Sequence, residues 1–269
     1  MVSGLGEDTF WVWFNREFPG CSYEIPKKLN DNDILLRYST LGFLPIEGKQ
    51  VSLCWELYPE MKRVFKTNQW DGKINKVIET ARYSTYRTVA TEYSVCDYSD
   101  FGSVDVIPIG VDTDKFIALS GKEELRKKYN IPTEEKLGIW IGTLHPMKGY
   151  LELVKYASMN PSIHWIVIWK WKQEAGFFNN AYNFVKLDQS SIVELINAAD
   201  FALFTSKLVP YYMSEWEMMA CDIPIVNING KREFEINKNP RELVINNGWD
   251  RISVKKQWID FLTKRGVTW

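Results

Sequence analysis

Short apolar runs recur along the whole chain, and segments with helical periodicity separate them. The runs that we expect to be strands are residues 30–39, 50–55, 87–93, 103–109, 138–144, 164–171, 184–187, 201–206 and 223–228. The segments that we expect to be helices are residues 7–18, 59–66, 72–84, 121–129, 149–159, 190–198, 214–221 and 250–264. Such alternation is typical of parallel sheets covered by helices. The sequence therefore predicts an α/β fold.

A charged stretch with several turn-forming residues, 112–136, interrupts this alternation near the middle of the chain. Charged segments bounded by glycine and proline are common between domains. The length of 269 residues also suits two modest domains. We therefore expect two α/β lobes that divide near residue 112, with ligands bound outside the carboxyl ends of the strands.

Composition argues against several classes of protein. The 33 basic and 34 acidic residues leave a net charge of -1, so no global positive field gathers nucleic acid. Four widely spaced cysteines and two histidines argue against a disulfide framework and against a zinc site. No apolar run reaches transmembrane length, and the N-terminus lacks the layout of a signal peptide. We expect a cytoplasmic protein.

The segment IWIGTLHPMKGYLELVKYA, residues 139–157, joins a strand candidate to an amphipathic helix candidate. Gly142 ends the strand, and Lys148 and Gly149 open the helix. Free N–H groups and the helix dipole converge at such a point and attract a phosphate, to which Lys148 would add a positive charge. A plain strand–helix turn with a solvated lysine has the same pattern. These residues alone leave both interpretations open.

A second segment, SEWEMMACDIPIVN, places Glu217 in the first turn of a helix candidate that leads into a strand candidate. Ser214 and Glu217 match the capping box, in which the serine caps the helix and the glutamate reaches back to it. A carboxylate at the carboxyl edge of a sheet also accepts hydrogen bonds from a vicinal diol such as a ribose. The two interpretations are compatible only if Glu217 points outward.

The order of four motifs makes the chain resemble a known family. The motifs are VIPIGVDTDKF (106–116), IGTLHPMKGY (141–150), SSIVELINAADFALFTS (190–206) and EWEMMACDIPIVN (215–227). Their order and intervals resemble those of family 4 glycosyltransferases of the GT-B fold, which read IPNGVD…F, GRL…KG, L…ADVFVLPS and E…LEAMACGTPVV. The resemblance covers about residues 87–228. It implies two Rossmann-like lobes, the first of them reduced, with a nucleotide-sugar held mainly by the second.

The resemblance implies a role for each matched residue. Lys148 matches the lysine that contacts the donor diphosphate, and Glu217 matches the glutamate that binds the ribose hydroxyls. Gly110 and Asp112 match the turn between the lobes. The implied donor-binding residues are Gly142, Thr143, Lys148, Tyr211, Tyr212, Glu217, Met218 and Met219. The segment from Met218 to Cys221 is expected to offer backbone N–H groups to a phosphate at a helix start.

The chain also departs from the family pattern. Thr143 stands where the family has an arginine, which removes a bidentate phosphate partner. Val209 stands where the family has the first glutamate of its pair, so the donor sugar stays open, and Tyr211 or Tyr212 is expected to contact it. The family's histidine-containing pair aligns loosely with Trp55 and Glu56. Glu56 is a candidate for acceptor contact or base catalysis, with a merely solvated acid as the alternative.

Both ends of the chain match the family in part. VSGLGEDTFWVWFNREF resembles the glycine loop and first helix of the first lobe, with Gly4 and Gly6 approaching a phosphate or the acceptor. The strand expected before them is missing, so either the lobe is trimmed or the chain begins late. Residues 251–269 resemble the terminal helix that packs back across the lobes. The expected domains are therefore 1–111, 112–250 and this terminal segment.

We thus expect a glycosyltransferase that moves a sugar from a nucleoside-diphosphate sugar to an acceptor hydroxyl, with Lys148 and Glu56 as catalytic residues. The resemblance implies retention of configuration, no metal and no cofactor, with a UDP- or GDP-sugar as donor. The acceptor is a glycan, a lipid-linked sugar, a protein or a modified DNA base. The alternatives are a phage-type DNA-base glucosyltransferase, a non-catalytic nucleotide-sugar or glycan-binding protein, and a nucleotide-dependent isomerase on the same fold.

Overall fold

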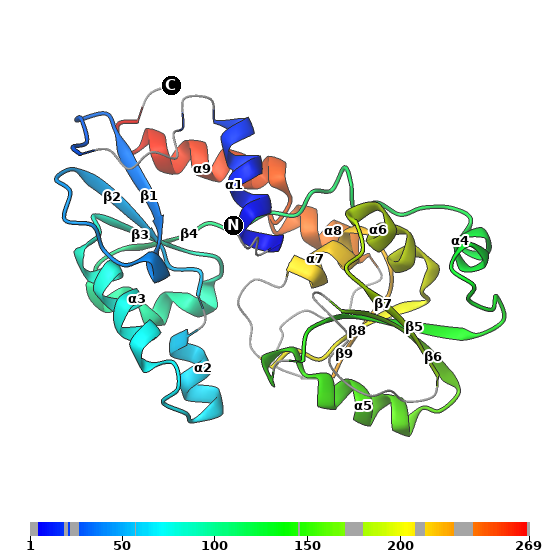
Figure 1. Cartoon of the computed structure of the whole chain (residues 1–269). Coiled ribbons are helices and arrows are strands. Elements are labelled where there is room, and N and C mark those ends of the chain that lie inside the picture. The colour runs from blue at the N-terminus through cyan, green and yellow to red at the C-terminus, as the bar shows by residue number, and fades with distance from the viewer. Residues whose placement is uncertain are drawn as a thin grey trace. The chain divides into compact units, whose positions relative to one another are not determined.

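The computed structural model describes residues 5–18, 21, 27–56, 58–144, 146–169, 180–207, 213–228 and 239–267. The chain forms two compact units, which we call the first unit (Met1–Gly110 and Arg251–Trp269) and the second unit (Val111–Asp250). Both are α/β units built on a parallel sheet (Figure 1). Within the described residues, no helix has the length and apolar character needed to span a membrane.

The sheet of the first unit has the strand order β1-β2-β3-β4, so the order in space follows the order in the chain. The strands are β1 (Ile34–Tyr38), β2 (Lys49–Leu53), β3 (Tyr86–Val89) and β4 (Val104–Val106). All neighbours are parallel, with Leu36 beside Val51 and Ser52 beside Arg87. The two central strands carry fully buried side chains such as Val51 and Val89. The strands predicted in this part of the chain are confirmed.

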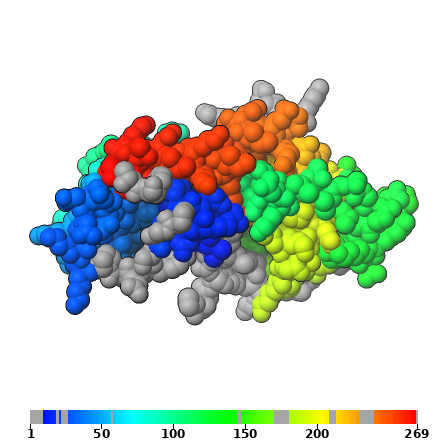
Figure 2. Space-filling model, turned by 90° about the horizontal axis from the view of Figure 1, so that it is seen from above, coloured from blue at the N-terminus to red at the C-terminus, as the bar shows by residue number. Residues whose placement is uncertain are grey.

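Helices cover both faces of this sheet (Figure 1). The helices are α1 (Leu5–Glu17) and α9 (Arg251–Thr263) on one face, and α2 (Tyr58–Phe65) and α3 (Asp71–Tyr83) on the other. Figure 2 shows α9, in red, lying against α1, in blue. Aromatic rings join the two helices, and the ring centroids of Phe14 and Trp258 lie 5.4 Å apart. In the same cluster, the ring centroids of Phe10 and Trp55 lie 4.7 Å apart. Aromatic side chains therefore build much of this core.

The sheet of the second unit has the strand order β7-β6-β5-β8-β9, again all parallel. The strands are β5 (Lys136–Gly142), β6 (Ile163–Trp169), β7 (Ala181–Val185), β8 (Phe201–Phe204) and β9 (Ile225–Asn227). Apolar residues alternate along β5, so that Ile139 and Trp140 belong to different cores. The five strands predicted here are confirmed, with shifts of a few residues at their ends.

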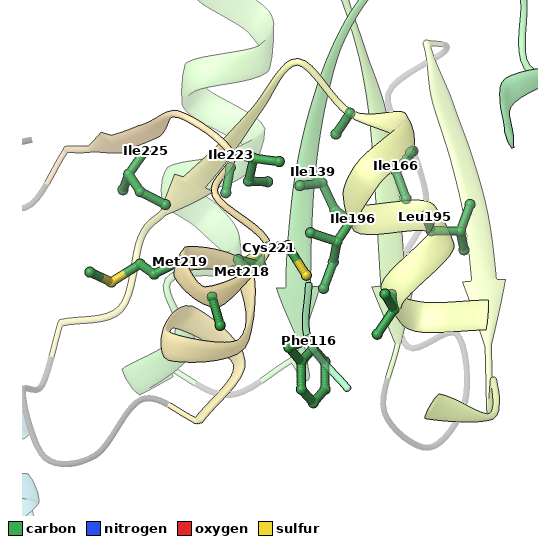
Figure 3. Packing of buried hydrophobic residues seen from close by; sticks show 14 of the residues in the cluster. Phe116, Ile139, Ile166, Leu195, Ile196, Met218, Met219, Cys221, Ile223 and Ile225 are labelled. Carbon is green, nitrogen blue, oxygen red and sulfur yellow. The ribbon is translucent and has the colours of Figure 1, made fainter. Parts of the chain in front are cut away.

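The larger core of the second unit lies under α6 (Gln189–Ala198), α7 (Met213–Ala220) and α8 (Pro240–Asn246) (Figure 1). Figure 3 shows Ile139 and Ile166 of the sheet meeting Ile196 of α6 and Met218 of α7. The helix α5 (Tyr150–Met159) packs on the other face through Leu153, over tryptophans of β5 and β6. Among the described residues of this unit, the remaining α-helix is α4 (Lys122–Lys128).

The helix α8 was not predicted. Its sequence begins with an Asn-Pro pair that reads as a turn, and it spans only Pro240–Asn246. Proline is nevertheless favourable at the first position of a helix, where its missing N–H has no partner to lose. Val244 of this helix is fully buried, so tertiary packing stabilises a segment too short to signal a helix by its pattern.

Candidate functional site

The second sheet has a topological switch point between β5 and β8. From β5 the chain continues to β6 and β7 on one side, and from β8 it continues to β9 on the other. The segments that leave these two strands therefore diverge at the carboxyl edge. In open parallel sheets, ligands bind at this point. The residues after Gly142 and after Phe204 are thus the first candidates for a site.

Two glycines shape the turn after β5. A Cβ atom at Gly142 would lie 2.5 Å from the ring of Trp140, so the indole covers this position. Gly149 has a left-handed backbone, with φ 67° and ψ 39°. A Cβ atom at Gly149 would lie 2.0 Å from the carbonyl oxygen of Thr205. The turn therefore packs directly against the end of β8, with Lys148 in its last residues before α5.

The start of α5 gives this turn positive character. Gly149 is the N-cap of the helix and makes no side-chain cap. The first N–H groups of a helix have no partner within it and carry partial positive charge. Glu152 in the first turn pairs with Lys207 at 2.7 Å, which offsets its negative charge. The half-buried Lys148 and these N–H groups form an arrangement suited to a phosphate.

The residues after β8 hold the turn in place. The hydroxyl of Thr205 donates to the carbonyl oxygen of Lys148 at 2.7 Å. The indole Nε1 of Trp140 donates to the same hydroxyl at 2.8 Å. The backbone N–H of Lys207 donates to the carbonyl oxygen of Met147, also at 2.8 Å. The segments that leave β5 and β8 are therefore bonded to each other at the switch point.

Helix α7 places Glu217 on the other segment of the switch point, because the helix returns from the carboxyl edge to β9. The side chain of Glu217 is half-buried, whereas that of Glu215 is 4% exposed. The pKa of the Cys221 thiol is raised to about 12, mainly by burial and further by the Glu217 carboxylate. Cys221 is therefore protonated at neutral pH and is not a nucleophile.

Two expectations for α7 need correction. The helix begins at Met213, so Ser214 lies inside its first turn and does not occupy the cap position of a capping box. Met218 and Met219 lie in the second half of the helix, and their side chains belong to the core. N–H groups at that place bond within the helix, so these two residues do not offer free donors to a phosphate.

Arg241 fixes the far end of α7. Its guanidinium donates from Nη1 to the carbonyl oxygens of Ala220 at 2.5 Å and of Phe116 at 2.8 Å. Nη2 donates to the carbonyl oxygen of Thr113, also at 2.8 Å. A cation that bonds the last carbonyl groups of a helix also complements its dipole. Arg241 thus joins α7 to the turn that opens the second unit.

We expect Arg241→Ala to lower the free energy of unfolding by about 2 kcal/mol, since it leaves backbone carbonyl groups without a charged donor. Urea denaturation of the full chain measures this change. Arg241→Lys is the matched control, because it keeps one charge but lacks the planar fork, and we expect it to recover part of the loss. A change below about 0.5 kcal/mol for Arg241→Ala, the range of an ordinary surface substitution, would contradict this role.

Glu56 lies just after the carboxyl end of β2 in the first unit. Its Oε2 accepts a hydrogen bond from the hydroxyl of Ser39 at 2.5 Å, and its Oε1 accepts one from Thr40 at 2.9 Å. The half-buried carboxylate is therefore oriented by two residues that follow β1. The neighbouring Trp55 is core, with 2% of its surface exposed. The structure thus gives Glu56 a fixed position at a sheet edge.

The other candidates are placed as follows. Gly4, Val209, Tyr211 and Tyr212 lie outside the described residues. Gly6 lies in the first turn of α1 rather than in a loop, and Thr143 is half-buried in the turn after β5. Gly110 has a φ of 82°, and Asp112 accepts the N–H of Lys115 at the start of the next turn. Among the described residues, no group of three His, Cys, Asp or Glu is placed to hold a metal ion.

The sequence alone did not predict four residues of this region, namely Trp140, Thr205, Lys207 and Arg241. Each acts through a contact with a distant segment, so no local pattern marks it. The strand order would have pointed to Thr205, because it directly follows β8 at the switch point.

Solved structures resemble this chain in fold. HepE from Anabaena, in complex with UDP-glucose, has a TM-score of 0.65 at 14% identity over 81% of this chain and 72% of its own. Sucrose-phosphate synthase from Thermosynechococcus elongatus has a TM-score of 0.60 at 13% identity over 83% of this chain. The chain spans less than two thirds of that protein, 65%. The catalytic domain of starch synthase IV from Arabidopsis thaliana, bound to ADP and acarbose, has a TM-score of 0.55 at 11% identity over 87% of this chain and 73% of its own.

These likenesses establish the fold. Together with the two parallel sheets, they confirm the predicted α/β architecture of two Rossmann-like units of the GT-B type. No protein-family model matches the sequence, and no curated protein matches it in sequence.

Proposed function

We propose that the protein transfers a sugar from a nucleoside-diphosphate sugar to an acceptor hydroxyl, with retention of configuration and without a metal ion. The observation that carries this proposal is the Lys148–Gly149 turn, which is held at the switch point of the second sheet directly before α5. Two proteins of similar fold were solved with UDP-glucose and with ADP, which supports a diphosphate nucleotide as the ligand.

In the proposed reaction, the bond between the anomeric carbon and the diphosphate oxygen breaks, and its electron pair leaves with the diphosphate. The acceptor oxygen bonds to the same face of the anomeric carbon, and its proton passes to the departing phosphate oxygen. Negative charge therefore develops on the diphosphate. Lys148 and the first N–H groups of α5 stabilise that charge, which is the largest kind of catalytic contribution in such sites. Orientation of the acceptor matters more than a strong base.

Glu217 is proposed to bind the ribose hydroxyls of the donor. It is half-buried on α7, and its two carboxylate oxygens are suited to accept hydrogen bonds from a vicinal diol. Thr143 offers a hydroxyl rather than a guanidinium to the diphosphate, so Lys148 carries a larger share of the charge there. A UDP- or GDP-sugar is the proposed donor.

Glu56 is proposed to bind a hydroxyl of the acceptor in the first unit. Two hydroxyl groups orient this carboxylate just after the carboxyl end of β2, and a carboxylate is an acceptor suited to the hydroxyl of a substrate. The acceptor is therefore a molecule with a free hydroxyl, such as a glycan, a lipid-linked sugar, a protein or a modified DNA base.

A second candidate is a protein that binds a nucleotide-sugar without transferring the sugar. Thr143 favours it, because the turn after β5 lacks the arginine that would share the charge on the leaving diphosphate. Slow release of free sugar from a donor, measured without any acceptor, separates the two candidates. A transferase releases sugar, whereas a binding protein leaves the donor intact.

Isothermal titration calorimetry with UDP, GDP, ADP and their sugars tests the shared part of both candidates. We expect one diphosphate nucleotide to bind best, and the corresponding nucleoside without phosphates to bind much more weakly. At a ligand concentration of about 100 times Kd, the preferred nucleotide should also raise the free energy of unfolding by about 2.7 kcal/mol. If none of these nucleotides binds, the proposed function is wrong.

A further inference from the structure

The hydroxyl of Thr205 is hydrogen-bonded to two groups, the indole N–H of Trp140 and the carbonyl oxygen of Lys148. Thr205 is 1% exposed and Trp140 is 2% exposed, so neither bond competes with solvent. An indole N–H only donates, so the hydroxyl accepts from Trp140 Nε1 at 2.8 Å. Its single proton is then directed to the carbonyl oxygen of Lys148 at 2.7 Å. The indole thus sets the direction in which Thr205 donates.

Two neighbouring contacts hold the same turn. The N–H of Lys207 donates to the carbonyl oxygen of Met147 at 2.8 Å. The left-handed Gly149 lies against the backbone carbonyl of Thr205, where even a Cβ atom does not fit. Three consecutive residues, 147–149, are therefore held by the segment 205–207. A buried hydroxyl in the middle of this arrangement fixes the backbone of Lys148 itself.

We propose that Thr205 is a positioning residue, oriented by Trp140, that holds Lys148 where it meets the donor diphosphate. This inference rests on the proposed function of Lys148. A cation stabilises a developing charge only at the correct distance, and a displacement of about 1 Å costs up to about 10²-fold in rate. Loss of one backbone anchor with the other two retained should displace Lys148 less. We therefore expect a loss of about tenfold.

The test compares Thr205→Val, which keeps the shape and loses the hydroxyl, with Thr205→Ser, which keeps the hydroxyl. The readouts are affinity for the diphosphate nucleotide that binds the wild type best and the rate of sugar release from its donor. Thr205→Val should weaken both by about tenfold, and Thr205→Ser should restore them to within about twofold. Thr88→Val is the matched control, because that buried hydroxyl has no hydrogen-bond partner in the described part of the chain.

A double-mutant cycle with Lys148→Ala separates positioning from general stability. Once Lys148 is absent, Thr205→Val should have little further effect on nucleotide affinity. An undiminished effect in that background would overturn the inference, because Thr205 would then act independently of Lys148. If Thr205→Val does not fold, Trp140→Phe replaces it in the cycle, since it removes the indole donor that orients the hydroxyl.

Amide hydrogen exchange of the unliganded protein distinguishes this inference from the proposed function. Thr205→Val should speed exchange in residues 147–150, and Thr205→Ser should not. If the wild type binds a diphosphate nucleotide but Thr205→Val changes neither this exchange nor the affinity, the inference alone is wrong. If the wild type binds none, the proposed function is wrong, and the inference about the donor is wrong with it.

Discussion

Replacement of Lys148 with alanine is expected to lower the rate of sugar release from the donor by about 10²–10³-fold. This is the range for removal of one preorganised group that stabilises a developing negative charge. The lysine precedes the N-cap of α5 at the switch point, so its charge and the helix N–H groups act on the same place. The side chain is half-buried and belongs to no hydrophobic core, so the free energy of unfolding should fall by no more than about 1 kcal/mol.

Two matched variants sharpen this test. Lys148→Arg keeps the charge and should retain more activity than Lys148→Ala. Lys155→Ala removes an exposed lysine from the same helix and should leave the rate within about twofold of the wild type. Sugar release needs no acceptor, so the unidentified acceptor does not limit the measurement. A folded Lys148→Ala variant with the wild-type rate would remove the proposed mechanism, whatever its affinity for the nucleotide.

The sequence predicted the strands and most helices because their signals are local. Each strand of the second sheet is an apolar run bounded by turn residues. The run of β5 is continuous because successive side chains point into two different cores, so that both faces of the strand are buried. The helix α8 was not predicted because a seven-residue segment that starts with proline is too short to show a helical periodicity. Its stability comes from contacts such as that of Arg241 with Phe116, which lie 125 residues apart in the chain.

The candidate site was predictable only in part for the same reason. Lys148 and Gly149 stand at a strand–loop–helix junction, which a sequence pattern marks. The bond from Thr205 to Lys148 spans 57 residues, and that from Trp140 to Thr205 spans 65. Such contacts exist only once β5 and β8 are neighbours in the sheet. The expectation for Met218 and Met219 has another origin. Both residues lie in the second half of the predicted helix 214–221 as well as of α7, so the expectation came from the family resemblance and not from the helix pattern.

The second large effect is expected for Gly149→Ala. An L-residue in the left-handed region costs about 1–2 kcal/mol. The added Cβ would also lie 2.0 Å from the carbonyl oxygen of Thr205, which is backbone at the end of a buried strand and has little freedom to move. Overpacking of this kind costs a further 1–3 kcal/mol, approximately. We therefore expect the free energy of unfolding to fall by about 3 kcal/mol, measured by urea denaturation.

Gly72→Ala is the matched control, because it makes the same glycine-to-alanine change at a position with space for the added methyl group. A Cβ at Gly72 meets nothing within 4 Å, and the residue lies in α3, where alanine is a better helix former by about 0.5–1 kcal/mol. It should therefore stabilise the protein slightly. Gly149→Ala should in addition weaken nucleotide binding, because relief of the clash moves the turn that carries Lys148. If Gly149→Ala matched the wild type in stability, the turn would not pack against Thr205, and the argument that this contact positions Lys148 would lose its basis.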